Sequence, residues 1–332
     1  MIRSILVPTD HSASANGAVA LAGDLAGHYA ARLTILHVGF RDGEAPSDLR
    51  DQARQAFDKA KAAGQPVSKH PEWSPYHQML EFMGRMILSD ARALAERHGA
   101  REVAELLDFG DDAERILHHA HHLGVDMIVM GTRGQSELQG LLLGSVSHKV
   151  QQLAPCNTIL VRQPEGSRFA DYQTILVATD GSEAARKACQ LAADLANKAH
   201  ATLVFAHVPL KGASPEQIAA AVDTGALSAR AQEDLRHGGL PIPIVTDETL
   251  AEVGQLILAQ ARAMAEAAGV AQIQTVVAEG DPARATLELA RDRRADLIVM
   301  GSRGIGMVEG LLLGSASNKV THLATCPVVV VR

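Results

Sequence analysis

The stretches GTRGQSELQGLLLGS at residues 131–145 and GSRGIGMVEGLLLGS at residues 301–315 decide the fold of this chain. Both place glycines at the first, fourth, tenth and fourteenth positions and a serine at the fifteenth, whereas the segments QSELQ and IGMVE between them have little in common. Each stretch begins at the end of a short apolar run and leads into a segment with a helical pattern. A strand, a glycine-spaced turn and a helix therefore occur twice in the same order.

These stretches belong to an internal repeat, which runs through the chain at one offset. The distance from residue 131 to residue 301 is 170 residues, and SILVPTDHS at residues 4–12 returns as TILVATDGS at the same offset. His37 pairs with His207 in the same way. With 332 residues, the chain is long enough for two domains that each bury a core.

Short apolar runs alternate with longer amphipathic segments, a pattern typical of βαβ units around a parallel sheet. The sequence predicts an α/β fold with two tandem doubly wound domains, at residues 1–163 and 170–332, related by the repeat and joined by a linker at residues 162–173. Two regions, 41–85 and 211–255, differ most between the halves, and we expect helical or loop insertions there. Five parallel strands are expected in each half, near residues 2–8, 33–39, 102–108, 126–131 and 157–162, and near 172–178, 203–209, 272–278, 296–301 and 327–332.

The composition excludes several classes of protein. Hydrophobic residues make up 47% and charged residues 21% of the chain, which fits neither a disordered chain nor a membrane protein. The net charge of −7 and the 3% of aromatic residues argue against a nucleic-acid-binding surface, so no nucleic acid and no membrane partner is expected. Three cysteines without a CxxC pair, and a start without a signal-peptide pattern, predict a cytoplasmic protein.

The spacing of glycine and serine favours phosphate binding. Glycine tolerates a positive φ and lets a ligand approach the backbone, which is our interpretation of Gly131 and Gly134. Gly144 and Ser145 then open a helix, whose unpaired N–H groups and dipole favour an anion. The repeat supplies the same residues at the 170-residue offset. The alternative interpretation is that the glycines only allow close packing between strand and helix.

Asp10 and Asp180 follow the first strand of each half. If the strand order reverses between the first and fourth strands, these carboxylates lie in the crevice where open α/β sheets bind ligands. There they could accept hydrogen bonds from ribose hydroxyls or hold Mg²⁺. The alternative role is N-capping of the first helix, which is common for aspartate after a strand.

With the pattern G-x2-G-x9-G-[ST] present twice and a D-x-S turn upstream of each copy, the chain resembles the universal stress protein family in its tandem form. The resemblance implies nucleotide alpha-hydrolase-like domains that bind ATP with Mg²⁺, with the backbones of Val38 and Val208 at the adenine edge and the glycine loops on the phosphates. It assigns to the nucleotide Thr9, Asp10, Val38, Met130, Gly131, Arg133, Gly134, Gly144, Ser145 and Val146 in the first half, and Thr179, Asp180, Val208, Met300, Gly301, Arg303, Gly304, Gly314, Ser315 and Ala316 in the second.

The halves also differ in ways that bear on the site. His11 stands where the second half has Gly181, at a position where glycine is common in the family, and Asn157 replaces Pro327 before the last strand. Arg133 and Arg303 could neutralise phosphate charge, or their side chains could simply face solvent.

Two further groups of residues have competing interpretations. His118 and His122 share a helix face and could bind zinc, but the repeat has Glu288 and Asp292 there, which favours a solvated face. The aligned thiols at residues 156 and 326 could sense redox state, although a single cysteine beside a strand usually acts as a small buried apolar group.

These observations predict a cytoplasmic ATP-binding protein of stress response or signalling, in which nucleotide occupancy regulates contacts with a protein partner that the sequence does not name. The chain has no GxxxxGK[ST] loop and no repeated nucleophile and base, so slow ATP hydrolysis is left open and a dedicated turnover enzyme is not favoured. The other alternative is a tandem scaffold with empty sites. A homo-oligomer, a dimer of tandem chains, is a separate expectation.

Overall fold

A computed structural model describes residues 2–39, 47–132, 143–162, 168–209, 211–236, 245–305 and 313–332. Its contacts divide the chain into two compact units, Ile2–Cys156 with Leu160–Arg168, and Asn157–Ile159 with Phe169–Arg332. These units correspond closely to the two halves of the repeat. Each half is described by itself.

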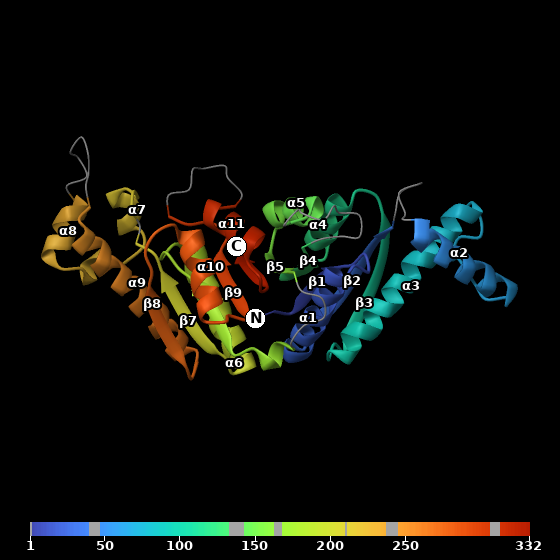
Figure 1. Ribbon diagram of the computed structural model, residues 1–332, viewed down its shortest axis with the longest axis horizontal. Coiled ribbons are helices and arrows are strands. Elements are labelled where there is room, and N and C mark those ends of the chain that lie inside the picture. The colour runs from blue at the N-terminus through green and yellow to red at the C-terminus, as the bar shows by residue number, and fades with distance from the viewer. Residues whose placement is uncertain are drawn as a thin grey trace. The chain divides into compact units, whose positions relative to one another are not determined.

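The first half is a parallel sheet in the order β3-β2-β1-β4-β5 (Figure 1). In its register, Ser4 lies opposite Arg32 on one side of β1, and Ile5 lies opposite Met127 on the other. The strand order therefore reverses between β1 and β4. The strands are β1 (Ser4–Pro8), β2 (Arg32–Gly39), β3 (Glu102–Phe109), β4 (Met127–Gly131) and β5 (Asn157–Val161), and the helices are α1 (Ala13–Tyr29), α2 (Ser47–Ala62), α3 (Pro75–Arg97), α4 (Asp112–His122) and α5 (Ser145–Leu153).

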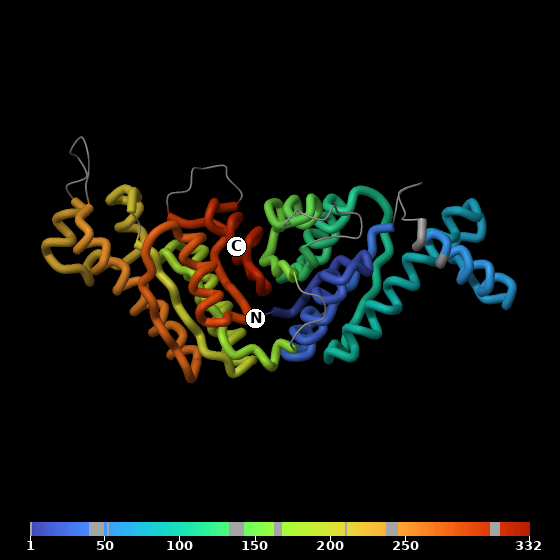
Figure 2. Tube along the Cα trace, viewed as in Figure 1, coloured from blue at the N-terminus to red at the C-terminus, as the bar shows by residue number. Residues whose placement is uncertain are grey.

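The second half repeats this architecture with the order β10-β9-β6-β7-β8. Thr174 lies opposite Thr202 and Ile175 opposite Leu297, which again places the reversal beside the first strand of the half. Figure 2 shows the same alternation of straight and coiled segments along this part of the chain. Its strands are β6 (Thr174–Ala178), β7 (Thr202–His207), β8 (Ile273–Val277), β9 (Leu297–Gly301) and β10 (Val328–Val331), and its helices are α6 (Glu183–Ala199), α7 (Pro215–Ala219), α8 (Ala229–Arg236), α9 (Asp247–Ala267), α10 (Pro282–Asp292) and α11 (Ser315–Leu323), with 3₁₀ turns η1 (Phe169–Asp171) and η2 (Thr224–Ala226).

The predicted α/β class, the doubly wound order and the ten strands are confirmed, and each strand end lies within two residues of its expected position. The aligned strands β2 and β7 end differently. β2 extends to Gly39, whereas β7 stops at His207, two residues before Pro209. Proline has no N–H to donate to a neighbouring strand, which explains the earlier end.

Helices cover both faces of each sheet, so the central strands are buried on both sides. In the first half α1 packs with α3, and α4 packs with α5; in the second half α6 packs with α9, and α10 packs with α11. Every residue of β4 and of β9 is buried. This explains why both strands are continuous apolar runs without polar alternation.

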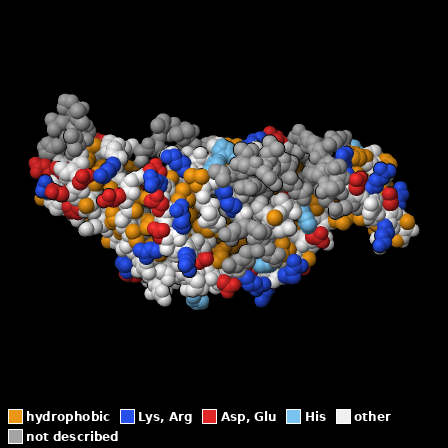
Figure 3. Space-filling model, in the orientation of Figure 1, with side chains coloured by type: hydrophobic (Ala, Val, Ile, Leu, Met, Phe, Trp, Pro, Cys, Tyr) orange, Lys and Arg blue, Asp and Glu red, His pale blue; other side chains and the backbone are white. Residues whose placement is uncertain are grey.

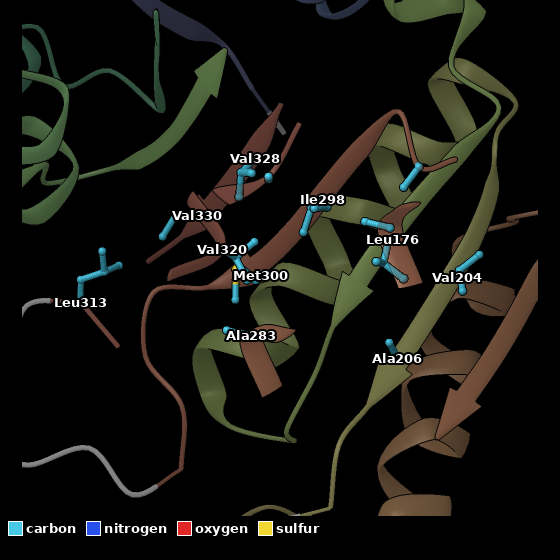
Figure 4. Close-up of a cluster of buried hydrophobic side chains, with 13 residues drawn as sticks. Leu176, Val204, Ala206, Ala283, Ile298, Met300, Leu313, Val320, Val328 and Val330 are labelled. Atoms are coloured by element: carbon cyan, nitrogen blue, oxygen red, sulfur yellow. The ribbon is translucent and has the colours of Figure 1, made fainter. Parts of the chain in front are cut away.

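One core cluster of the second half lies between the sheet and the pair α10 and α11 (Figure 4). Leu176 comes from β6 and Val204 from β7, Ile298 and Val330 come from β9 and β10, and Val320 comes from α11. The first half has an equivalent cluster that includes Leu6, Leu36, Ile128, Val150 and Leu160. These cores fix the carboxyl ends of the strands, where the predicted site lies.

The two insertions are helical but built differently. In the first half α2 packs beside the start of α3. In the second half α7, η2 and α8 precede α9, and α7 and α8 lie near the start of α9 (Figure 1). The predicted linker also contains structure, because the side chains of Phe169 and Tyr172 are buried and their rings are 5.4 Å apart.

Candidate functional site

The predicted turns lie at the point where the strand order reverses. Asp10 follows β1, whose last register pair joins Pro8 to Leu36, and Asp180 follows β6. β2 and β4 flank β1, and β7 and β9 flank β6. This is the crevice at which open α/β sheets bind ligands. The reversal that the sequence analysis assumed is therefore present in both halves.

Hydrogen bonds within each turn give aspartate and serine separate roles. The Oδ1 atoms of Asp10 and Asp180 accept from the backbone N–H two residues later, at 3.0 Å in each half. The side chains of Ser12 and Ser182 are the N-caps of α1 and α6, and each accepts a backbone N–H of the first helical turn. The alternative that the aspartates cap these helices is wrong, because the serines do so.

The residue between aspartate and serine has a left-handed backbone in both halves. φ is 66° at His11 and 80° at Gly181. Glycine adopts this conformation without strain, whereas another residue loses on the order of 1 kcal/mol. The family preference for glycine at this position thus has a structural reason, and the first half departs from it at an energetic cost.

A buried histidine supports each turn from the neighbouring strand. The Nδ1 atoms of His37 and His207 lie 2.8 and 2.9 Å from the carbonyl oxygens of Thr9 and Thr179. Because a carbonyl only accepts, Nδ1 carries the hydrogen in both rings. Burial lowers the pKa of both histidines, so they are neutral near pH 7.

These histidines and their glycine neighbours were missed as site residues in the sequence. A Cβ on Gly84 would lie 2.5 Å from Cδ1 of Leu107 and 3.2 Å from Cδ2 of His37, and a Cβ on Gly254 would lie 2.8 Å from Cδ2 of His207. The glycines therefore make room in α3 and α9 for the rings. The signal was present, since both the histidines and the glycines recur at the 170-residue offset.

The backbone of Val38, in β2, faces the space beyond the first strand of its half. Thr9 N donates to Leu36 O, and Thr179 N donates to Ala206 O at 2.9 Å. In a parallel ladder, backbone groups of successive residues point to alternate sides, so the residues two further along face the same side. β1 has ended at that level, so the N–H and C=O groups of Val38 point past its end, whereas Val208 follows the last residue of β7.

The first glycine of each loop serves helix packing. A Cβ on Gly131 would lie 2.6 Å from Oγ of Ser14, and a Cβ on Gly301 would lie 2.8 Å from the backbone of Ala184 and Ala185. Neither Gly131 nor Gly301 is among the described glycines that have a positive φ. At this position the packing alternative accounts for glycine, and the interpretation that Gly131 needs a positive φ is wrong.

The second half brings the turn and the glycine loop together. Ile305 N donates to Oδ2 of Asp180 at 2.8 Å, and Oγ of Ser182 donates to the carbonyl of Arg303 at 3.2 Å. A Cβ on Gly304 would lie 2.5 Å from the same Oδ2. The Arg303 side chain is exposed. The aligned Arg133 and Gly134 of the first half lie outside the described residues.

The last glycine of each loop begins a helix, as predicted. Gly144 and Gly314 are the N-caps of α5 and α11, with no side-chain cap, and their own N–H groups donate to the carbonyls of Thr132 and Ser302. The first N–H groups of a helix have no partner within it and can bind an anion. Ser145 and Ser315, at the first helical position, are exposed.

A second serine fixes each of these helix starts. The buried Oγ atoms of Ser147 and Ser317 donate to the carbonyls of Gly131 and Gly301, at 2.8 and 2.7 Å. They tie the helix start to the end of the preceding strand. These serines were not predicted as site residues, although GSxS recurs in the repeat.

Four of the predicted contact residues place their side chains in or against the core. Met130 and Met300 are buried members of the core clusters, and Val146 and Ala316 pack against the same clusters. Only their backbones are therefore suited to meet a ligand in the crevice.

The histidine-rich helix α4 shows no metal site. The rings of His118 and His122 are stacked with centroids 6.0 Å apart, and Nε2 of His119 lies 2.7 Å from Oδ2 of Asp108. Within the described ranges no group of three or more metal-binding side chains occurs.

Of the two aligned cysteines, Cys326 lacks the lowered pKa of a reactive thiol. Burial raises the pKa of Cys326 to about 12, so its thiol stays protonated, and Cys156 is half-buried. These properties fit small apolar groups beside the last strand of each half.

The surface has mixed charge on the face that Figure 3 presents. Lys and Arg side chains lie among Asp and Glu side chains there. Over the part of the chain that the structure describes, no helix combines the length and the apolar character needed to cross a membrane.

Comparisons with known proteins agree with this geometry. The model of the universal stress protein family matches residues 1–162 and again residues 171–332. Universal stress protein YxiE of Bacillus subtilis is 37% identical over 165 residues, covering 48% of this chain and 99% of its own. A universal stress protein of Mycolicibacterium smegmatis is 30% identical over 243 residues, covering 73% of this chain and 72% of its own.

A solved structure extends the likeness over both halves. The crystal structure of a universal stress protein from Archaeoglobus fulgidus covers 99% of this chain and 98% of its own, with a TM-score of 0.59 and 22% identity. At that identity the likeness concerns the fold. With the two family matches and the two reversals of strand order, the chain belongs to the universal stress protein family and carries two tandem domains of it.

Proposed function

We propose that each half binds ATP with Mg²⁺ at the reversal of strand order, and that nucleotide occupancy regulates contacts with a protein partner in the cytoplasm. The observation that carries the proposal is the junction in the second half, where Asp180 holds both its own turn and the backbone of Ile305. A hydrogen bond thereby joins the carboxylate that follows the first strand to the glycine loop that follows the fourth.

The groups directed into the crevice fit an adenine nucleotide from base to phosphate. The N–H and C=O of Val38 or Val208 offer one donor and one acceptor to the adenine edge, and the N–H groups at the starts of α5 and α11, which no intrahelical bond uses, favour phosphate. Each oxygen of Asp180 accepts one backbone N–H and has a second lone pair. Carboxylate and phosphate oxygens are the ligands that Mg²⁺ prefers.

Binding is favoured over turnover. Phosphoryl transfer to water needs a group that positions the nucleophile. The imidazoles that support the turns from β2 and β7, His37 and His207, are buried and bonded to threonine carbonyls through Nδ1, and the exposed His11 of the first turn has glycine as its counterpart in the second. We therefore expect ATP hydrolysis far below the roughly 1 s⁻¹ at which ordinary enzymes begin.

The first test identifies the small molecule that copurifies with the chain and measures whether the chain hydrolyses ATP. Denaturing the protein and analysing the released small molecules should yield adenine nucleotide, and a phosphate-release assay should show negligible turnover. A steady rate near 1 s⁻¹ would make the chain an ATPase. If nothing is released and a stripped sample binds no ATP, the tandem scaffold is the better function.

Assembly is a separate part of the proposal. We infer separately that the tandem chains form homodimers. Light scattering on the nucleotide-loaded protein should give about twice the 35.1 kDa mass of the chain. A single-chain mass at all concentrations would contradict it.

A further inference from the structure

The insertion of the second half packs on both pieces of the candidate site. We call residues 213–236 the strap; it contains α7, η2 and α8. Its apolar side chains form a buried cluster with the first turns of α9. The cluster consists of Ile218, Ala221, Leu227, Ala231, Leu250, Val253 and Ile257.

The strap covers the turn after β6. A Cβ on Gly181 would lie 2.8 Å from the carbonyl oxygen of Ala221 and 3.0 Å from Cγ1 of Ile257. Only a residue without a side chain fits beneath the strap here. Arg186 closes the same turn from α6, because its Nη1 donates to the Gly181 carbonyl at 2.5 Å.

The strap also holds the glycine loop. The side chain of Ile305 packs against the strap cluster, while its backbone N–H donates to Asp180. One residue thus joins an apolar contact with the strap to a polar contact with the turn. Any movement of the loop away from Asp180 also withdraws this side chain from the cluster.

The first half lacks these features at the aligned positions. Gln135 takes the place of Ile305, Asp51 that of Ala221, and His11 that of Gly181. Its insertion packs instead on α3, where Ala53, Leu80 and Met83 form a cluster against which Phe109 packs. The described contacts of the two insertions therefore differ. The residue at position 305 is isoleucine, whereas its counterpart at position 135 is glutamine.

We propose that the strap sets the nucleotide affinity of the second half by holding Ile305, and through it the glycine loop, in the conformation that binds phosphate. The inference rests on the proposed ATP site. Coupling between two parts of a protein is reciprocal, so a strap that strengthens binding is itself stabilised by the bound nucleotide. The residue aligned with Ile305 in the first half is glutamine, so we expect no such coupling there.

The test is hydrogen exchange on the full stripped chain, titrated with MgATP. Peptides covering residues 181–185 report the second site, peptides covering residues 213–236 report the strap, and peptides covering residues 11–15 are the internal control for the first site. In the parent protein, ATP should slow exchange in all three. In Ile305→Gln, which copies the first half, half-maximal protection at residues 181–185 should need about tenfold more ATP, and the strap should no longer respond.

Two further variants separate coupling from damage. Ile305→Val keeps a branched apolar side chain and should stay within about threefold of the parent. Leu227→Ala weakens the cluster from the strap side and should raise the ATP requirement of the second site as Ile305→Gln does, with the first site unchanged.

The outcomes distinguish this inference from the proposed function. If ATP protects residues 181–185 equally well in the parent, in Ile305→Gln and in Leu227→Ala, the sites bind nucleotide and the strap has no role. Protection of the turn without any change in the strap of the parent also overturns the inference. If ATP protects neither turn, the proposed function fails, and the inference fails with it.

Discussion

The turns TDHS at residues 9–12 and TDGS at residues 179–182 have the same backbone but different surroundings. Both keep the aspartate-to-serine hydrogen bond at 3.0 Å and the left-handed residue between them. In the first half the exposed His11 lies 3.6 Å from a carboxylate oxygen of Asp90, whereas in the second half Gly181 lies beneath Ala221 of the strap. Hydrogen bonding thus sets the turn, and the side chain at its tip decides whether an insertion can close over it.

The largest expected effect comes from replacing Gly181 of the second turn with histidine, the residue at the aligned position of the first turn. In Gly181→His the new side chain would meet the Ala221 carbonyl and Ile257, and the residue would occupy a left-handed conformation. We expect the second half to lose about 3 kcal/mol of unfolding free energy from overpacking and backbone strain. Urea unfolding of parent and variant measures this. An unchanged midpoint would show that the strap can lift off at little cost.

Removing one acceptor from the second turn should have a smaller effect. Asp180→Asn keeps the shape of the side chain but replaces one of its two oxygens with an NH₂ group. That group faces either Ser182 N or Ile305 N and cannot accept its hydrogen bond. The loss should be about 2 kcal/mol, because one backbone N–H is left without its acceptor. Asp10→Asn is the matched variant of the first half. Urea unfolding that shows equal stability for Asp180→Asn and the parent would argue that Asp180 does not hold the loop.

The pH dependence of stability should reveal the buried histidines. Burial lowers the pKa of His207, and its Nε2 is buried with no hydrogen-bond partner among the described residues. The unfolded chain therefore binds a proton below pH 6.5 that the folded chain does not, so stability falls as the pH falls, by up to about 1.4 kcal/mol per pH unit for one group.

Comparison with a variant isolates this contribution. His207→Asn keeps a donor for the Thr179 carbonyl and removes the titrating group. Urea unfolding at pH 7.5 and pH 5.5 should show a smaller loss of stability in the variant than in the parent. Identical losses would mean that His207 takes up its proton as readily in the folded chain as in the unfolded one.

The smallest expected effect comes from the reverse substitution, which places glycine at position 11 of the first turn. His11→Gly relieves the left-handed strain of the first turn, and the greater freedom of glycine in the unfolded chain offsets part of the gain. The net stabilisation should be about 0.5 kcal/mol. Thermal unfolding of the parent and of His11→Gly measures which of the two is more stable. A destabilised variant would mean that the contact of His11 with Asp90 outweighs the strain.

Much of the fold could be predicted from the sequence because its signals are local. Buried strands such as Met127–Gly131 are short continuous apolar runs, and Gly-Ser marks the starts of α5 and α11. The repeat then tested each interpretation against a second copy of the same pattern.

What escaped prediction depends on contacts between distant segments. Aspartate and serine are both good N-caps, so the choice between Asp10 and Ser12 depended on geometry that the sequence does not contain. The role of His37 becomes visible only with Thr9 beside it, and that of Gly131 only with Ser14 against it. The strap could not be foreseen, because Ile305 joins it from a loop far along the chain.

The most direct test of the central claim is a calorimetric titration of MgATP into the stripped parent chain and into Gly304→Val. A Cβ at residue 304 would lie 2.5 Å from an Asp180 oxygen that already accepts the Ile305 N–H, so the variant should lose the second site and keep the first. We predict two ATP per parent chain and one per variant chain, with saturating ATP raising the parent melting temperature by about 5–10 °C. Two equally tight sites in both proteins, or no binding by the stripped parent, would contradict the account.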